Sequence, residues 1–123
     1  MQTILIHPLH AAKLGMLVLP TCKGIYRIDV CTIVRVEAIS NYSKLFFNNG
    51  KTLVAAKVLS WFEERLAPAQ FLRIHRSHIV NKNFIDQYLK GCGGKIKLLN
   101  GECIDVSKRR KNHFLKCWLS TAA

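Results

Sequence analysis

The chain has 123 residues, half of them hydrophobic, which is enough apolar material for the core of one domain and argues against intrinsic disorder. Lysine and arginine number 19 against 7 aspartate and glutamate residues, so the formal net charge is +12. A folded domain this basic repels itself unless a polyanion is a usual partner, and nucleic acid is the commonest such partner; a merely basic surface and an acidic membrane are the alternatives.

The cysteines and histidines form no metal-binding pattern. The cysteines are Cys22, Cys31, Cys92, Cys103 and Cys117. Their number is odd, no two form a C-x-x-C pair, and the histidines complete no zinc-finger spacing. We therefore predict no metal and no cofactor. We also predict free thiols that act as small apolar residues in a reducing, cytoplasmic location.

The N-terminal segment, residues 1–15, has no clean hydrophobic period. It begins without basic residues, and His7, Pro8 and His10 break its apolar run, so we expect no signal peptide. No stretch of the chain approaches about 18 uninterrupted apolar residues, so we expect no membrane span and no membrane partner. We interpret residues 1–15 as a linker or N-terminal extension, or as a strand added to a sheet edge, and we place the domain at residues 16–120.

Short segments with alternating or β-branched residues dominate the first half of the chain. They predict strands at residues 16–19, 25–28, 33–38, 44–47 and 52–55. Pro20 ends the first of these strands, and the polar residues 40–43 separate the third from the fourth. Asn49-Gly50 predicts a tight hairpin, because both residues tolerate positive φ.

The period changes at residues 57–66. The apolar residues that share one helical face there are Val58, Leu59, Phe62 and Leu66. This pattern predicts an amphipathic helix that ends before Pro68, with Trp61 and Phe62 in the core.

The second half of the chain mixes basic with apolar residues. Residues 71–81 alternate partly between the two kinds, residues 91–94 read as a flexible glycine-rich turn, and Asn100-Gly101 predicts a second hairpin. The further strands are predicted at residues 84–89, 95–99 and 103–106.

The tail predicts a second helix that begins after Ser107, a residue type preferred at the N-cap. The apolar residues on its core-facing side are Phe114, Leu115, Trp118 and Leu119. The basic residues 108–111 would occupy its first turn, where cations oppose the helix macrodipole. A partner anion would relieve that conflict, so we interpret this basic run as functional.

Many short strands with one middle and one terminal helix predict a mostly β domain. Four segments then carry a resemblance to a known family: residues 33–44, 49–51, 71–81 and 100–111. The most specific motif reads R-I-H-R-S-x-I-V-N and is followed by V-S-x-R-R-K. In order and spacing these segments resemble the LytTR-type DNA-binding domain of bacterial response regulators and stand-alone transcription factors, over roughly residues 17–117.

The resemblance implies an elongated, mostly β fold with about ten short, mainly antiparallel strands in small sheets. It also implies a sequence-specific transcriptional regulator, and not an enzyme, whose loops enter successive major grooves of double-stranded DNA. We expect two copies on a direct-repeat site, with the DNA bent as a consequence. A receiver domain would belong to a full response regulator.

The resemblance places DNA contacts in three segments. The expected contact residues are Asn41, Tyr42, Ser43, Lys44, His75, Arg76, Ser77, Lys108, Arg109, Arg110 and Lys111. Arg76 and Arg109 are expected to reach bases, because arginine contacts guanine with two prongs, while the other residues of 108–111 contact phosphates.

Other interpretations of the same residues stay open. Asn41 reads adenine or adopts a left-handed turn conformation, and Tyr42 stacks on bases or fills the core. His75 and His78 are interpreted as structural and not as a metal or acid–base pair. An RNA-binding module is the alternative function, although no exposed aromatic pattern supports it. A histidine nuclease is the third, and no carboxylate pair supports that.

Overall fold

The computed structural model describes residues 15–91 and 93–120. The interpretation of residues 1–14 as a linker, and Cys92, therefore lie outside the described residues. Ten strands form three antiparallel sheets. The strands are β1 (Met16–Thr21), β2 (Gly24–Asp29), β3 (Ile33–Ile39), β4 (Tyr42–Phe47), β5 (Thr52–Ala55), β6 (Phe71–His75), β7 (His78–Asn81), β8 (Ile85–Leu89), β9 (Lys95–Leu98) and β10 (Cys103–Asp105). The helices are α2 (Leu59–Arg65) and α3 (Lys108–Leu119), with short 3-10 helices η1 (Val30–Thr32) and η2 (Lys82–Phe84).

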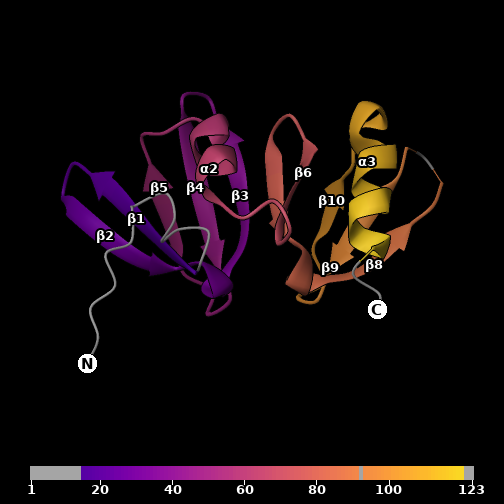
Figure 1. The fold of residues 1–123 in the computed structure, drawn as a ribbon, viewed down its shortest axis with the longest axis horizontal. Coiled ribbons are helices and arrows are strands. Elements are labelled where there is room, and N and C mark those ends of the chain that lie inside the picture. Colours follow the sequence, from indigo (N-terminus) through magenta and orange to yellow (C-terminus); the bar gives the residue numbers. More distant parts are fainter. Residues whose placement is uncertain (1–14, 92, 121–123) are drawn as a thin grey trace.

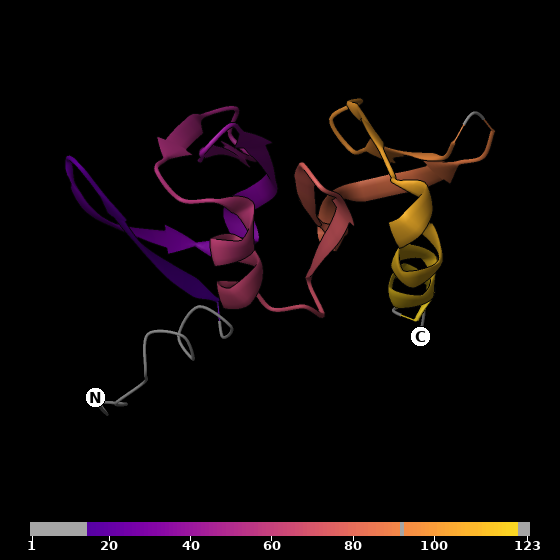
Figure 2. The same ribbon diagram turned by 90° about the horizontal axis from the view of Figure 1, so that it is seen from above.

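The three sheets follow one another along the long axis of the molecule (Figure 1). The two-stranded sheet β1-β2 stands at one end, and the five-stranded sheet β5-β4-β3-β7-β6 lies in the middle. The three-stranded sheet β10-β9-β8 stands at the other end. Seen from above, α2 and α3 lie on the same side of these sheets (Figure 2). The predicted mostly β, elongated fold with a middle and a C-terminal helix is thus confirmed.

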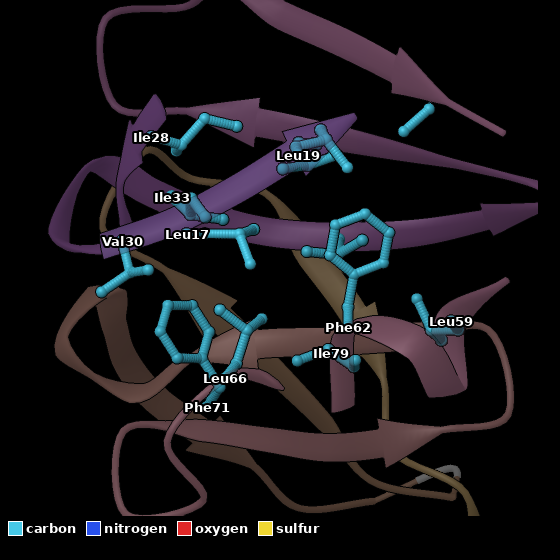
Figure 3. Close-up of a cluster of buried hydrophobic side chains, with 13 residues drawn as sticks. Leu17, Leu19, Ile28, Val30, Ile33, Leu59, Phe62, Leu66, Phe71 and Ile79 are labelled. Carbon is cyan, nitrogen blue, oxygen red and sulfur yellow. The ribbon is translucent and has the colours of Figure 1, made fainter. Parts of the chain in front are cut away.

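Two hydrophobic clusters hold the domain together, and β3 and β7 contribute to both. The first cluster, shown in Figure 3, gathers α2 and β1 against the five-stranded sheet around Phe62, which is fully buried. The second packs α3, through Phe114, on the three-stranded sheet and on β6. Ile79 of β7 enters the first cluster and its neighbour Val80 enters the second, as alternation along a strand requires.

An ion cluster joins the middle sheet to the three-stranded sheet. Arg35 of β3 is buried, and its guanidinium lies 3.6 Å from the centre of the Phe46 ring. Two of its nitrogens donate to the two carboxylate oxygens of Glu102, each at 3.2 Å, and a third lies 2.6 Å from Glu37. Glu102 belongs to the β9–β10 turn, so these contacts tie two sheets together at the edge where that turn lies.

Both Asn-Gly hairpins form where they were predicted. Gly50 lies in the β4–β5 turn at φ 87°, and Gly101 lies in the β9–β10 turn at φ 94°. These angles are in the left-handed region that glycine adopts without a steric penalty.

Several boundaries differ from the prediction. β1 continues through Pro20, which pairs with Ile25, because a two-stranded sheet has only edge strands and these tolerate proline. Residues 40–43 are not a single polar interruption, since only Ser40 and Asn41 form the turn and β4 begins at Tyr42. Val58 is the N-cap of α2 and half exposed, so it does not lie on the buried face.

The described cysteines are free thiols, and most of them are not core residues. Cys22, Cys31 and Cys103 are exposed, while Cys117 is partly buried. The prediction that they act as small apolar residues is therefore wrong for the three exposed ones. In residues 15–91 and 93–120, no helix has both the length and the apolar character needed to cross a membrane.

Candidate nucleic-acid interface

The three segments expected to contact DNA lie on one edge of the molecule. The β3–β4 turn lies between the paired residues Ile39 and Tyr42. Just before it, the Ala38 amide donates to the Ser77 carbonyl in the β6–β7 turn at 2.9 Å. The Ser107 amide, just before α3, donates to the Ile74 carbonyl at the end of β6, also at 2.9 Å. Figure 1 shows the two turns and the beginning of α3 side by side along its upper edge. We call this edge the contact edge.

The β3–β4 turn exposes two of its expected contact residues and buries a third. Asn41 is exposed, and Tyr42 is 50% exposed, so the tyrosine does not fill the core. Ser43 is fully buried, and its hydroxyl donates to the Lys57 carbonyl at 2.7 Å. Because β4 begins at Tyr42, alternation turns Tyr42 and Lys44 outward and Ser43 inward. Ser43, which was expected to contact DNA, is thus turned away from the surface in this structure and fixes the backbone at Lys57.

The β6–β7 turn presents Arg76 from a backbone held on both sides. Arg76 is exposed, while His75 and Ser77 are partly buried. The Ser77 amide donates to Nδ1 of His75 at 3.1 Å, so the neutral imidazole carries its proton on Nε2. This supports the structural interpretation of His75, whose ring closes the turn.

Arg73 braces the same turn, and sequence reasoning did not single it out. Its Nε donates to the His75 carbonyl at 2.9 Å, and one terminal nitrogen donates to the Arg76 carbonyl at 2.6 Å. The other terminal nitrogen pairs with Glu63 of α2 at 2.5 Å. Arg73 lies inside the matched motif, next to a register shift between Arg73 and His75, and the motif alone does not reveal that its guanidinium bonds the turn.

The basic run at the start of α3 divides into exposed residues and one partly buried residue. Ser107 is the N-cap, and its hydroxyl accepts from the Arg110 amide at 3.3 Å, as predicted. Lys108, Arg109 and Lys111 are exposed. Four successive basic residues in the first turn place several positive charges beside a helix N-terminus that is itself positive, so an anion is favoured there.

Arg110 is the residue of this run that turns toward the protein. It lines a cavity of about 120 Å³ between α2, β6 and α3, together with Arg73 and His113. Its Nε is buried and has no partner among the described residues. Burial lowers the pKa of Arg110, and the nearby charges of Arg73 and Arg109 lower it further. Arg110 stays charged, but its buried Nε has no hydrogen-bond acceptor among the described residues, and the charges of Arg73 and Arg109 repel it.

The histidines near the contact edge do not form a reactive pair. The His75 and His78 ring centres are 5.4 Å apart, and burial lowers the pKa of His78, which therefore stays neutral near pH 7. The Nε2 of His113 lies 3.5 Å from Sγ of Cys117. Among residues 15–91 and 93–120, no group of three or more metal-binding side chains gathers. The arrangement brings charge and hydrogen-bond donors to a surface, which suits binding.

A mostly β domain with basic, polar turns aligned on one edge has the features of a nucleic-acid-binding domain. Comparison with known families matches residues 23–118 to the LytTr DNA-binding domain. The chain belongs to this LytTR family of DNA-binding domains.

A solved structure supports the same assignment. The LytTr DNA-binding domain of a protein described as a methyl-accepting/DNA response regulator from Bacillus cereus is similar, with 26% sequence identity and a TM-score of 0.72. The similarity covers 84% of this chain and 95% of that one. A comparison with curated proteins finds no match. The family is one of DNA-binding domains.

Proposed function

We propose that this domain binds double-stranded DNA sequence-specifically, as the output domain of a bacterial transcriptional regulator in the cytoplasm. The observation that carries the proposal is the common edge on which Asn41, Arg76 and Arg109 are exposed from three different turns or helix starts. Their spacing along the molecule suits contacts at successive places on a duplex rather than at one point.

In this mechanism, contacts between basic side chains and phosphates fix the position of the domain on the DNA. A few other side chains select bases. Lys108, Lys111 and Lys44 contact phosphates, since lysine is a compact charge suited to them. Arg76 and Arg109 read guanine O6 and N7, and Asn41 reads adenine with its amide. Tyr42 packs against the sugar–phosphate backbone beside Asn41, where half of its surface is free.

Arg110 gains a partner when DNA binds. Its Nε is buried without a partner among the described residues, and the positive charges of Arg73 and Arg109 oppose its own, which Glu63 only partly offsets. A phosphate at the start of α3 supplies the missing negative charge, which favours Arg110 leaving the cavity for the DNA. The partly buried His75 and Ser77 hold the turn and touch the backbone rather than bases.

One domain offers few base contacts, so two copies are proposed on a direct-repeat site. The DNA bends so that both copies keep their contacts, and sequence-dependent flexibility then adds to specificity. In a full response regulator, a receiver domain would control the pairing of the two copies.

The test is selection from a library of random duplexes, followed by binding at several salt concentrations. A repeated motif should emerge, and the logarithm of affinity should fall against the logarithm of salt with a slope of about −4 to −8. Arg76→Ala and Arg109→Ala should relax the base preference at different positions, by roughly 1–3 kcal/mol each.

Lys51→Ala is the matched control, because Lys51 is exposed in the β4–β5 turn, at the end of β4 remote from the contact edge. It should change neither the motif nor the affinity. If no motif emerges and single strands bind equally well, the proposal fails, and an RNA-binding module becomes the better interpretation.

A further inference from the structure

Two lysines outside the matched motifs lie on either side of the three segments of the contact edge along the long axis of the molecule. Lys57 follows β5, and Lys90 follows β8. Neither residue belongs to the three segments already described, and neither forms an ion pair with a residue of the described chain.

Lys57 is fixed beside the β3–β4 turn. The last residue of β5, Ala55, pairs with Ser43, which directly follows Tyr42. The buried hydroxyl of Ser43 donates to the Lys57 carbonyl at 2.7 Å. The Lys57 ammonium lies 5.3 Å from the centre of the Trp61 ring, which holds a cation in place without neutralising its charge. A positive charge is thus kept at this end of the edge.

Lys90 follows β8, at the start of a turn that is tied at Gly94 to the residue before the N-cap of α3. The β8–β9 turn lies between Leu89 and Lys95, which pair with each other, and Lys95 also pairs with Asp105 of β10. The Val106 amide donates to the Gly94 carbonyl at 3.2 Å, which fastens this turn next to the N-cap of α3. Lys90 is exposed, whereas the ammonium of Lys95 is engaged by Asp105 at 2.8 Å.

We propose that Lys57 and Lys90 are phosphate contacts that flank the three base-reading segments and lengthen the stretch of DNA backbone that the domain holds. In Figure 1, the β5–α2 connection lies along the upper edge on one side of those segments, and the end of β8 lies at the end of the molecule on the other side, beyond α3. Duplex DNA carries a phosphate charge about every 1.7 Å of its axis, so a surface that runs from the five-stranded sheet to the three-stranded sheet faces phosphates at both ends. This inference rests on the proposed function and names further contacts of the same interface.

The test measures the salt dependence of binding to the selected duplex and to an unrelated duplex. Lys57→Ala and Lys90→Ala should each make the slope shallower by about 0.9, and the double variant by about 1.8. Affinity should fall by the same factor on both duplexes, because phosphates carry no sequence information. Lys57→Arg and Lys90→Arg should restore the slope.

Lys51→Ala is again the control with an exposed lysine in a turn at the other edge, and circular dichroism checks that each variant is folded. An unchanged slope for a folded alanine variant overturns the inference for that lysine. A loss of preference at one base position also overturns it, since that outcome means base reading. Failure of the unaltered domain to bind duplex DNA would overturn the proposed function itself, whereas normal binding with unchanged variant slopes removes only this inference.

Discussion

At the scale of single residues, the contact edge separates side chains that reach outward from side chains that hold the backbone. Arg76 and Arg109 are exposed, whereas Arg73 and Ser43 donate hydrogen bonds to backbone carbonyls of neighbouring loops. Arg73 alone bonds two carbonyls of the β6–β7 turn and Glu63 of α2. The direction of Arg76 therefore depends on a residue that need not touch DNA.

Arg73→Met should loosen this turn and weaken base discrimination. Two backbone carbonyls lose a charged hydrogen-bond donor, and each such hydrogen bond is worth roughly 1.5–3 kcal/mol in a well-formed site. Part of that loss should appear as a lower free energy of unfolding. The base preference at the position read by Arg76 should also flatten, which library selection measures. Arg65→Met is the control, because Arg65 stacks on Trp61 and pairs weakly with Glu64 in α2. If Arg73→Met lowers only the midpoint of denaturation and leaves the base preference intact, Arg73 is merely structural.

The sequence located the three segments of the contact edge, but it did not give the direction in which every side chain points. The turn around Asn41 and the basic run before Asn112 were found because residue type and order suffice for that. Ser43 was misplaced since shifting the start of a strand by two residues changes which side chains belong to the turn and which alternate into the core. Likewise, which member of a four-residue basic run faces the protein depends on helix phase, and here it is Arg110.

At the scale of elements, the stability of α3 depends strongly on its first turn. Its N-terminal residues are basic, so they oppose the helix macrodipole, and the Ser107 cap is the side chain that satisfies an amide there. The same cap fixes the start of α3 and therefore the positions of Lys108 and Arg109.

Ser107→Ala should destabilise the domain by about 1 kcal/mol, because the Arg110 amide loses its side-chain acceptor and keeps only the Ser107 carbonyl at 3.1 Å. The midpoint of urea denaturation measures this change. Ser120→Ala, at the other end of α3, should cost less, since Ser120 donates only to the last turn. Equal losses for both variants would mean that the cap at Ser107 contributes nothing particular.

Hairpins were predicted where the turn chemistry is local and missed where it is not. Asn-Gly supplies the positive φ of the β4–β5 and β9–β10 turns by itself. The β6–β7 turn contains Arg76 and Ser77, neither of which demands a turn, and it is closed by the His75 ring and the Arg73 guanidinium. Residues 71–81 therefore looked like one continuous segment.

At the scale of the whole molecule, the Arg35 cluster and the shared core make the sheets one unit. The hydrogen bonds from Arg35 hold the pKa of Glu102 below its ordinary value of 4.5, although partial burial opposes the shift and Asn100 assists it. Burial likewise lowers the pKa of His78 from 6.5, with Glu37 opposing and Arg35 assisting. Both groups titrate at lower pH in the folded state than in the unfolded chain.

Stability should therefore fall in two steps as the pH is lowered. A group with a depressed folded pKa contributes fully above its unfolded pKa and loses that contribution as the pH falls toward its folded value. His78 should begin to destabilise the domain below about pH 6.5, and Glu102 should add to this below about pH 4.5. Denaturation midpoints measured across this range test the order of the steps.

Glu102→Gln separates the two contributions. It should lower stability at pH 7 and flatten the decline below about pH 4.5, while the earlier step from His78 persists. An unchanged decline in this acidic range would show that Glu102 is not responsible for it.

The division between reaching and holding side chains has an evolutionary consequence. Asn41, Arg76 and Arg109 are exposed, whereas the backbone beneath them is fixed by other residues. Substitutions at these three positions should thus cost little folding stability, so selection can try them one at a time. Under the proposed function, a lineage of such domains would change the DNA sequence it binds by single substitutions, while the scaffold stays as it is.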